Sequence, residues 1–258
     1  MHYGIGMVSL QPAELLFLGI IQGVAEWLPV SSEGMIMIVL LNVFKTDVAS
    51  AFSYAVFLHL GTMLAVLAKF RRDVIKIIFE RPKTFNIILV ATVFTSITAL
   101  PLMIFIKNFE GRFANVLIGL LLIVTGILLR LPKSGYRKAS EMTALESALL
   151  GIAQGFAILP GISRSGTTVS YLLLRRVNEE DALKLSFLVS IPAIAGAIMI
   201  SSLPSGISMS GAAIVVTSAF VTGYIMIDFL LKIARNIGFS LFCILFGSVA
   251  VIFSVLTM

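Results

Sequence analysis

An amide and a carboxylate, Gln22 and Glu26, lie four residues apart in an otherwise apolar stretch near the start of the sequence. Residues four apart share one face of a helix, so these two side chains can together hold a cation or orient a water molecule. A carboxylate in apolar surroundings is costly to bury and is therefore a candidate functional residue. The alternative is a structural hydrogen bond between Glu26 and the turn that follows it.

The turn after Glu26 carries three more polar side chains, Ser31, Ser32 and Glu33. Ser32 could act as a nucleophile or a phosphate ligand with Glu26 as its base, or it could cap the helix that follows the turn. Glu33 could be a second metal ligand, or a carboxylate favoured by the dipole of that helix. Both pairs of alternatives stay open at this point.

A second polar group is centred on Arg164, the only basic residue left within an apolar zone. Hydroxyl side chains and glycines surround it, namely Gly161, Ser163, Ser165, Gly166, Thr167 and Thr168. A guanidinium beside hydroxyl groups and glycine-exposed backbone N–H groups, at the start of a helix, suits a phosphate. The alternative is a salt bridge to Glu26 that pins the two polar groups together, and the two roles can coexist.

The elements that position these residues must lie in a membrane. The chain has 258 residues, of which 59% are hydrophobic and 12% charged, and its mean hydropathy is +1.06. A soluble domain is nearer a quarter charged, and one core cannot hide this much apolar surface, so lipid must be the solvent for most of it. The net charge of +6 lies in short loops between apolar runs, which indicates membrane orientation rather than nucleic-acid binding. No linker divides the chain, so residues 1–258 are predicted to form a single integral membrane domain.

Six apolar runs are long enough to span a bilayer, which takes roughly 20 residues. They cover about residues 50–69, 84–106, 113–130, 183–201, 211–231 and 238–257. Two further regions, about 13–43 and 144–175, are broken by proline, glycine and serine at residues 27–34 and 159–166. Each half is too short to cross alone, and a non-helical turn at membrane depth must be buried in protein. We therefore predict an all-α polytopic membrane protein with six transmembrane helices and two re-entrant helical hairpins.

The distribution of basic residues supports this topology. If both hairpins return to the side from which they enter, fifteen of the 19 basic residues fall on one side of the membrane. They lie in the segments 69–83, 130–138, 175–184 and 232–235, while Lys45, Lys107 and Arg112 fall on the other side. Positive residues accumulate in cytoplasmic loops, so the first set is predicted to be cytoplasmic and both termini external.

A short motif recurs later in the chain. Gly19-Ile20-Ile21-Gln22-Gly23 matches Gly151-Ile152-Ala153-Gln154-Gly155, and Leu28-Pro29 is echoed by Leu159-Pro160. The predicted topology places the entrance of the first hairpin outside and that of the second inside. The repeat is therefore predicted to be inverted, with halves of about 10–130 and 144–257, and the site is expected where the two broken segments meet.

Two other titratable residues fall within predicted spans. His59 lies between Phe57-Leu58 and Leu60-Gly61 and is interpreted as a packing histidine rather than a catalytic one. Asp228 lies near the cytoplasmic end of its span, close to Lys232, which favours a local ion pair.

Both polar segments resemble motifs of the undecaprenyl-diphosphate phosphatase family, which is linked to bacitracin resistance. The first segment is similar to the family pattern [E/Q]xxxE-x-LPVSS and reads Gln22-Gly23-Val24-Ala25-Glu26-Trp27-Leu28-Pro29-Val30-Ser31-Ser32. The second is similar to the pattern PGxSRSxxT and reads Pro160-Gly161-Ile162-Ser163-Arg164-Ser165-Gly166-Thr167-Thr168. A third stretch, Phe57-Leu58-His59-Leu60-Gly61-Thr62, resembles the family between the two, and the resemblance covers nearly the whole chain.

The resemblance implies an enzyme that removes the terminal phosphate from an undecaprenyl-type diphosphate at the outer face of the plasma membrane. Such an enzyme recycles the lipid carrier for cell-envelope glycan synthesis. The resemblance also implies a divalent cation, Mg²⁺ or Ca²⁺, and partners limited to the lipid diphosphate and membrane lipids, without nucleic acid and with room for a homodimer.

By motif position, Gln22 and Glu26 carry over as metal or base residues and Ser32 as a hydroxyl near the reacting phosphate. With the residue analysis above, we predict catalytic roles for Glu26, Ser32 and Arg164, and a metal held by Gln22, Glu26 and Glu33. The predicted substrate-binding residues are Ser31, Gly161, Ser163, Ser165, Gly166 and Thr168.

One position departs from the family pattern, which reads SSxGH after LPV. Here the segment reads Ser31-Ser32-Glu33-Gly34-Met35, and methionine neither transfers a proton nor attacks phosphorus. Either Ser32 with Glu26 and a metal suffices, or Glu33 substitutes for the histidine, or this member has lost hydrolysis. The alternative function, a non-hydrolytic polyprenyl-phosphate flippase or anion carrier, would need no nucleophile.

Overall fold

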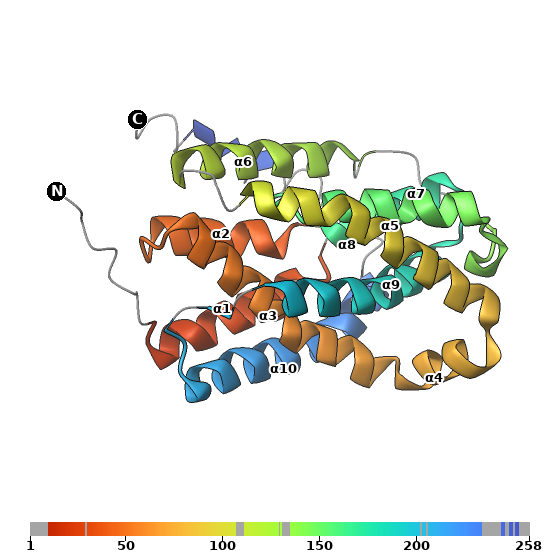
Figure 1. Ribbon diagram of the computed structural model, residues 1–258, viewed down its shortest axis with the longest axis horizontal. Coiled ribbons are helices and arrows are strands. Elements are labelled where there is room, and N and C mark those ends of the chain that lie inside the picture. The colour runs from red at the N-terminus through yellow and green to blue at the C-terminus, as the bar shows by residue number, and fades with distance from the viewer. Residues whose placement is uncertain are drawn as a thin grey trace.

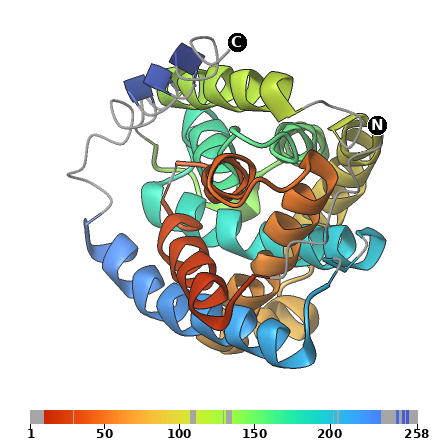
Figure 2. The same ribbon diagram turned by 90° about the vertical axis from the view of Figure 1, so that its left-hand side faces the viewer.

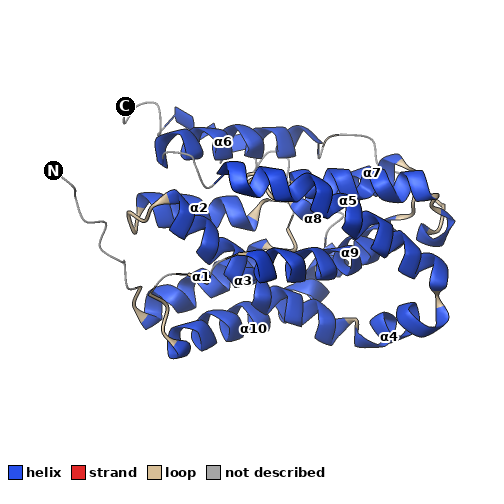
Figure 3. Cartoon of the chain, viewed as in Figure 1, coloured by secondary structure: helices blue, strands red, loops and turns tan. Residues whose placement is uncertain are grey.

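The computed structural model describes residues 10–28, 30–106, 111–128, 130, 135–201, 203–204, 206–233, 244–245, 248–249 and 251–252. Within these ranges the named elements are ten α-helices and one 3-10 helix, η1. The first half contains α1 (Pro12–Ala25), α2 (Ser32–Asn42), α3 (Val48–Lys69), α4 (Arg71–Glu80), α5 (Pro82–Ile106) and α6 (Gly111–Leu128). The second contains η1 (Ala139–Glu141), α7 (Ala144–Phe156), α8 (Arg164–Leu174), α9 (Glu179–Ile200) and α10 (Met209–Ile233). Figure 3 shows helices joined by loops, without a strand in the described part of the chain.

The prediction of an all-α membrane protein is confirmed. Four helices, α3, α5, α9 and α10, are long and apolar enough to cross a membrane, and α6 is a shorter apolar helix. The last predicted span, about 238–257, lies largely outside the described residues, so the count of six spans stays a prediction. In the bundle the helices run broadly along one axis (Figure 1), and the view nearly down that axis shows the short helices among the longer ones (Figure 2).

The segment between the first two spans differs from our expectation of a short basic loop. Residues 71–80 form α4, whose Ile75, Ile78 and Phe79 side chains are exposed while Ile77 is buried. The charged residues of this segment alternate with apolar ones at helical spacing, so a short amphipathic helix forms instead.

The two predicted breaks are present, between α1 and α2 and between α7 and α8, while the re-entrant course of these helix pairs in a membrane stays a prediction. A serine caps the second helix of each hairpin, because Ser31 Oγ accepts from Gly34 N at 3.3 Å and Ser163 Oγ accepts from Gly166 N at 3.1 Å. The first hairpin occupies the left half of Figure 1 and the second lies mainly in the right half, so their turns meet inside the bundle.

The lengths of four helices in the first half of the chain recur in the second half. The helices α1, α2, α3 and α5 have 14, 11, 22 and 25 residues, and α7, α8, α9 and α10 have 13, 11, 22 and 25. The recurring glycines have a packing role in both halves. A Cβ on Gly19 would lie 1.9 Å from Ser218 Oγ of α10, and one on Gly151 would lie 2.2 Å from the Ala91 oxygen of α5. Small residues thus allow α1 to approach α10 and α7 to approach α5 closely.

The turn of the first hairpin is anchored through Trp27, which is buried. Its indole N–H donates to the Gly223 carbonyl oxygen of α10 at 2.8 Å, and its ring packs edge-on against Phe187 of α9 at 5.2 Å between centroids. An apolar body and one satisfied polar atom are what a buried tryptophan requires. These contacts fix the direction in which Glu26, the preceding residue, points.

Candidate functional site

Glu26 is the centre of the site, and its side chain is 3% exposed. Its Oε2 atom accepts a hydrogen bond from Ser32 Oγ at 2.7 Å and another from Gln22 Nε2 at 2.9 Å. Gln22 and Glu26 therefore lie on one face of the helix, as their i, i+4 spacing predicts, and their joint hold on a cation stays a prediction. A buried carboxylate keeps its charge only where such donors or cations surround it, and the described neighbours supply both.

Arg164 brings the second hairpin into the same site. It is the first residue of α8, its Nη2 donates to Glu26 Oε1, and its Nη1 donates to the Ser186 carbonyl oxygen at 3.3 Å. The ion pair that we gave as one alternative for Arg164 is thus formed. The guanidinium has five N–H donors and also lines a cavity, so the ion pair leaves it able to bind an anion.

His59 joins this site, and our interpretation of it as a packing residue misses this contact. Its Nε2 lies 3.2 Å from Glu26 Oε2, and its Nδ1 lies 2.7 Å from the Ala55 carbonyl oxygen. A carbonyl oxygen only accepts, so Nδ1 carries a proton, and a second proton shared between Nε2 and Oε2 satisfies the other contact. The neighbours of His59 in sequence are apolar, and only the packing of α3 against the first hairpin reveals its partner.

Direct contacts join the two hairpin turns. Ser31 Oγ accepts from Gly161 N at 3.0 Å, and Ser165 Oγ donates to the Leu28 carbonyl oxygen at 3.3 Å. A Cβ on Gly34 would lie 2.8 Å from Gly161 N, so the turns touch through backbone. Buried backbone groups that would otherwise lack partners are satisfied in this way.

The other predicted substrate-binding residues lie at the same junction, and most of their polar atoms already have partners. Thr125 of α6 donates to the Gly161 carbonyl oxygen and accepts from Ser163 N, both at 3.1 Å. Thr168 Oγ1 donates to the Arg164 carbonyl oxygen at 2.8 Å and lies 2.6 Å from Ser186 Oγ. The hydroxyl groups of Ser163 and Thr168 therefore shape the turn around Arg164, and direct contact between these residues and substrate stays a prediction.

A cavity of about 120 Å³ opens beside the ion pair. Its polar lining residues are Glu33, His59, Thr95, Ser96, Gln154, Arg164 and Ser190. Its apolar lining comes mainly from α5 and α9, with Val56 of α3 and with Ala157 and Ile158 of the turn after α7. Thr95, Gln154 and Ser190 were not among the predicted site residues. The sequence repeat could have indicated Gln154 as a site residue, because it matches Gln22.

Two buried oxygens near Glu26 have no hydrogen-bond partner among the described residues, Gln22 Oε1 and Glu33 Oε1. No group of three or more His, Cys, Asp or Glu side chains within the described ranges is placed to hold a metal ion. Mg²⁺ sites commonly combine one or two carboxylates with water and substrate phosphates. The donor set therefore fits a cation that the substrate helps to hold, rather than one held by protein alone.

Met35 lies outside the group of polar contacts. It is half-buried and packs with Leu28 against Ala25 and Val30. The imidazole nearest to Glu26 among the described residues thus comes from α3 rather than from position 35.

Asp228 has a described partner in another helix, and its expected pair with Lys232 stays a prediction. It pairs with Lys69 at the end of α3, and the Lys69 ammonium also lies 4.8 Å from the centre of the Tyr224 ring. The side chain of Lys232 lies outside the described residues.

The fold and the site define a polytopic α-helical membrane protein in which two broken hairpins form a buried Arg–Glu pair, and the arginine of this pair lines a cavity. The family model described as bacitracin resistance protein BacA matches residues 15–252. The chain belongs to this family.

Similar proteins include several that carry the name undecaprenyl-diphosphatase. The one from Methanothrix thermoacetophila is 45% identical over 92% of this chain and 94% of its own. The one from Methanococcoides burtonii is 40% identical over 98% of this chain and 99% of its own, and that from Methanopyrus kandleri is 37% identical over 91% and 93%. These matches cover nearly the whole of both chains, so they include both hairpins.

Proposed function

We propose that this protein hydrolyses an undecaprenyl-type diphosphate to the monophosphate and phosphate. The observation that carries the proposal is the set of contacts at Glu26, where one buried carboxylate meets a guanidinium, a serine hydroxyl and an imidazole. An anion-binding group, a hydroxyl nucleophile with its base, and a proton carrier are what phosphoanhydride hydrolysis needs. The names of the relatives support the same activity.

Arg164 binds the diphosphate in this proposal. Its remaining N–H donors face the cavity, where they neutralise the charge of the phosphate oxygens and the charge that develops as the anhydride breaks. Contact with a phosphate weakens the hold of Arg164 on Glu26, which makes the carboxylate a stronger base. Substrate binding and activation of the base are therefore linked through one ion pair.

Ser32 attacks the terminal phosphorus. Its hydroxyl already donates to Glu26 Oε2 at 2.7 Å, so the proton passes to the carboxylate as the new O–P bond forms. The bond from phosphorus to the bridging oxygen breaks. His59 gives its proton to that oxygen, and the polyprenyl monophosphate leaves. Water then cleaves the serine phosphate and restores the hydroxyl.

A divalent cation, Mg²⁺ or Ca²⁺, belongs to the proposal. Gln22, Glu26 and Glu33 would hold it together with the substrate. When bound, it supplies further neutralisation of the phosphate charge. The unpartnered oxygens of Gln22 and Glu33 support this assignment.

The charge distribution supports a proposed orientation of the protein in its membrane. We place the protein in the plasma membrane with both termini external and the cavity opening towards the outer leaflet. The lipid tail then lies against the apolar residues of α5 and α9, and the product returns to carry cell-envelope glycan precursors.

The test is phosphate release from undecaprenyl diphosphate by the purified, folded protein in Mg²⁺, in Ca²⁺ and in EDTA. We expect release with at least one cation and a large decrease in EDTA. Restoration by added cation separates metal removal from damage by the chelator. Absence of release in every condition would contradict the proposed function.

A further inference from the structure

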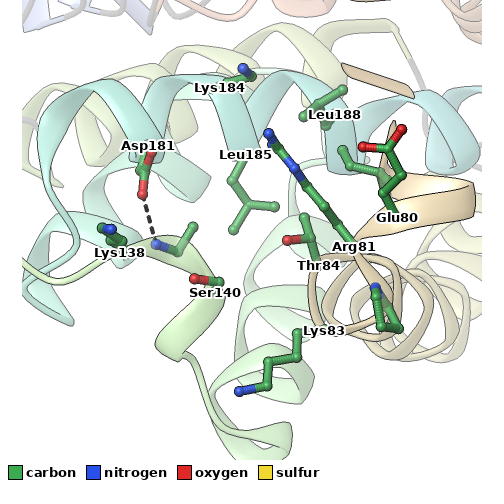
Figure 4. Close-up of a pocket in the computed structure, with 13 residues that line it drawn as sticks. Glu80, Arg81, Lys83, Thr84, Lys138, Ser140, Asp181, Lys184, Leu185 and Leu188 are labelled. Atoms are coloured by element: carbon green, nitrogen blue, oxygen red, sulfur yellow. Dashed lines mark hydrogen bonds between the residues drawn. The ribbon is translucent and has the colours of Figure 1, made fainter. Parts of the chain in front are cut away.

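A second cavity, of about 590 Å³, lies away from the polar site. It is bounded by the α4–α5 junction, by η1 with the preceding Lys138, and by the first turns of α9 (Figure 4). In α9 its lining residues, such as Lys184 and Leu188, precede Ser190 and Ile194 of the first cavity. The two cavities therefore lie towards opposite ends of the same pair of helices, α5 and α9.

Four cationic side chains surround this second cavity, Arg81, Lys83, Lys138 and Lys184, against two carboxylates, Glu80 and Asp181 (Figure 4). The excess of positive charge favours an anionic ligand. The first three residues of α5 also line the cavity, and the helix dipole adds partial positive charge at that end.

Two of the four cations are already engaged and two are not. Lys184 Nζ lies 2.6 Å from Asp73 Oδ1, and Arg81 Nη1 lies 4.0 Å from the same oxygen. Lys83 and Lys138 have no side-chain hydrogen bond or ion pair within the described ranges. Asp181 Oδ2 accepts from Ala139 N at 2.9 Å, and neither Asp181 nor Glu80 forms an ion pair with these two lysines within the described ranges. Two exposed ammonium groups that form no ion pair with the described residues thus line a cavity in which four cations stand against two carboxylates.

The neighbouring helix α4 indicates what reaches this cavity. Its exposed Ile75, Ile78 and Phe79 form an apolar surface beside exposed basic residues, between two membrane-crossing helices. A basic amphipathic helix in that position lies in the plane of the interface, with its apolar side chains among the acyl chains. The cavity next to it therefore lies at the level of the lipid headgroups, and Ile77, Leu185 and Leu188 give it an apolar wall.

We propose that this cavity binds the phosphate group of an anionic phospholipid, with Lys83 and Lys138 as the principal ligands. A phosphate with a glycerol backbone matches a polar cavity that has an apolar wall, while the acyl chains continue along α4. The same phosphate chemistry occurs in soluble phosphate esters, so the experiment must separate the two sources.

The experiment titrates the purified full chain in neutral detergent with dioleoylphosphatidylglycerol and counts bound lipid by native mass spectrometry. The test variant is Lys83→Gln with Lys138→Gln. The matched control is Arg72→Gln with Lys76→Gln, which removes two exposed charges from α4 that do not line the cavity. We expect the affinity to fall about tenfold in the test variant and less than about twofold in the control.

Two further arms complete the design. Dioleoylphosphatidylcholine is expected to bind weakly to every variant, and glycerol 3-phosphate is expected to compete poorly with the anionic lipid. Equal weakening in the test and control variants would indicate diffuse attraction and overturn the proposal, as would no weakening in either. Tight, lysine-dependent binding of glycerol 3-phosphate would overturn the lipid assignment. Unchanged phosphate release by both variants shows that they are folded, and it is independent of the lipid titration.

Discussion

The two carboxylate oxygens of Glu26 contact four side chains, which come from three separate parts of the chain. Gln22 and Ser32 are local to the first hairpin, His59 belongs to α3, and Arg164 belongs to the second hairpin. Removing one partner of a buried charged pair leaves the other uncompensated. Substitutions here must therefore preserve shape and hydrogen bonding if they are to report on chemistry.

Glu26→Gln is the sharpest test of the base. The amide keeps the size of the side chain and one acceptor oxygen, but it does not take a proton from Ser32. We expect the rate of phosphate release at saturating substrate to fall about 100-fold to 10,000-fold. Glu14→Gln makes the same change in the first turn of the same helix and is expected to stay within about twofold. A Glu26→Gln protein within tenfold of the parent would exclude Glu26 as the base.

Substitutions of His59 and Met35 provide a second test at the scale of single residues. If His59 holds the proton for the leaving group, His59→Gln lowers the rate of release by about 100-fold or more. Met35→His then changes the rate little, since an imidazole is already present at Glu26. The opposite outcome, an active His59→Gln variant and a large gain in Met35→His, would mean that hydrolysis is weakened by the loss of a histidine at position 35. Both rates are measured under the same metal conditions.

At the scale of the elements, the hairpin turns meet through glycine and serine because no larger residue fits there. Gly161 has a φ of +108°, and a Cβ on it would lie 2.4 Å from the Ile118 carbonyl oxygen of α6. Ser31 adopts a left-handed conformation, with φ of 56°, while its hydroxyl binds Gly161 N. The turn of each hairpin is thus completed by the other hairpin and by α6.

Gly161→Ala and Gly196→Ala separate this packing requirement from the general effect of adding a methyl group. Gly161→Ala combines backbone strain with a clash and is expected to cost at least about 2 kcal/mol of unfolding free energy. A Cβ on Gly196 in α9 meets no atom within 4 Å, so the alanine there is expected to be neutral or to stabilise by up to about 1 kcal/mol. Thermal unfolding in detergent measures both, and equal melting temperatures would contradict this account of the turn.

The second hairpin is held at its other end by Glu146, near the start of α7. This buried carboxylate accepts from Arg137 Nη1 at 3.0 Å and from Arg175 Nε at 2.9 Å. The hydrogen bonds from Arg137 lower the pKa of Glu146 from its usual 4.5 to about 2. A lowered carboxyl pKa stabilises the fold above the unfolded-state pKa, and this stabilisation is lost as the pH falls towards the folded-state value.

The lowered pKa of Glu146 predicts how the stability of the protein depends on pH. Glu146→Gln is expected to lower the melting temperature at pH 7, and the difference from the parent should shrink as the pH falls from about 5 to about 2. Glu141→Gln, an exposed neighbour, serves as the control. A difference that stays constant over this pH range would show that the charge of Glu146 does not stabilise the hairpin.

At the scale of the whole molecule, the positions of the two cavities and the uneven distribution of basic residues agree on one orientation in the membrane. The polar site opens between the later turns of α9 and α5, whereas the basic cavity lies at the first turns of both helices. The accumulation of positive residues on that second side favours the cytoplasm. We therefore expect the hydrolytic site and the lipid-binding cavity to face opposite leaflets.

Labelling with a membrane-impermeant maleimide tests this polarity in intact cells. In a Cys243→Ala background, Val43→Cys in the loop after α2 is expected to be labelled from outside. Arg72→Cys in α4 is expected to react only in inside-out vesicles. The reverse labelling pattern would place the polar site at the cytoplasmic face. Labelling of both positions from outside would contradict the predicted arrangement of the hairpins.

The sequence alone determined the class of the molecule and the position of its breaks. A membrane protein needs long apolar runs and has an uneven distribution of basic residues, and both can be read from the sequence. Proline, glycine and serine mark where a helix is interrupted. The pairing of Gln22 with Glu26 was also predictable, because it depends only on helix periodicity. The span at about 238–257 stays a prediction.

Tertiary structure decided which residues meet. The contact between Glu26 and Arg164 was one of two alternatives until the hairpin turns were seen together. The contact of His59 with Glu26 and the cavity between α4 and α9 were not indicated by the sequence pattern. Contacts between distant segments depend on how helices approach, and close approach is set by glycines whose partners lie elsewhere in the chain. For this reason the sequence predicted the groups that could do chemistry, and only the packing of α3, α5, α9 and the two hairpins assembled them into one site.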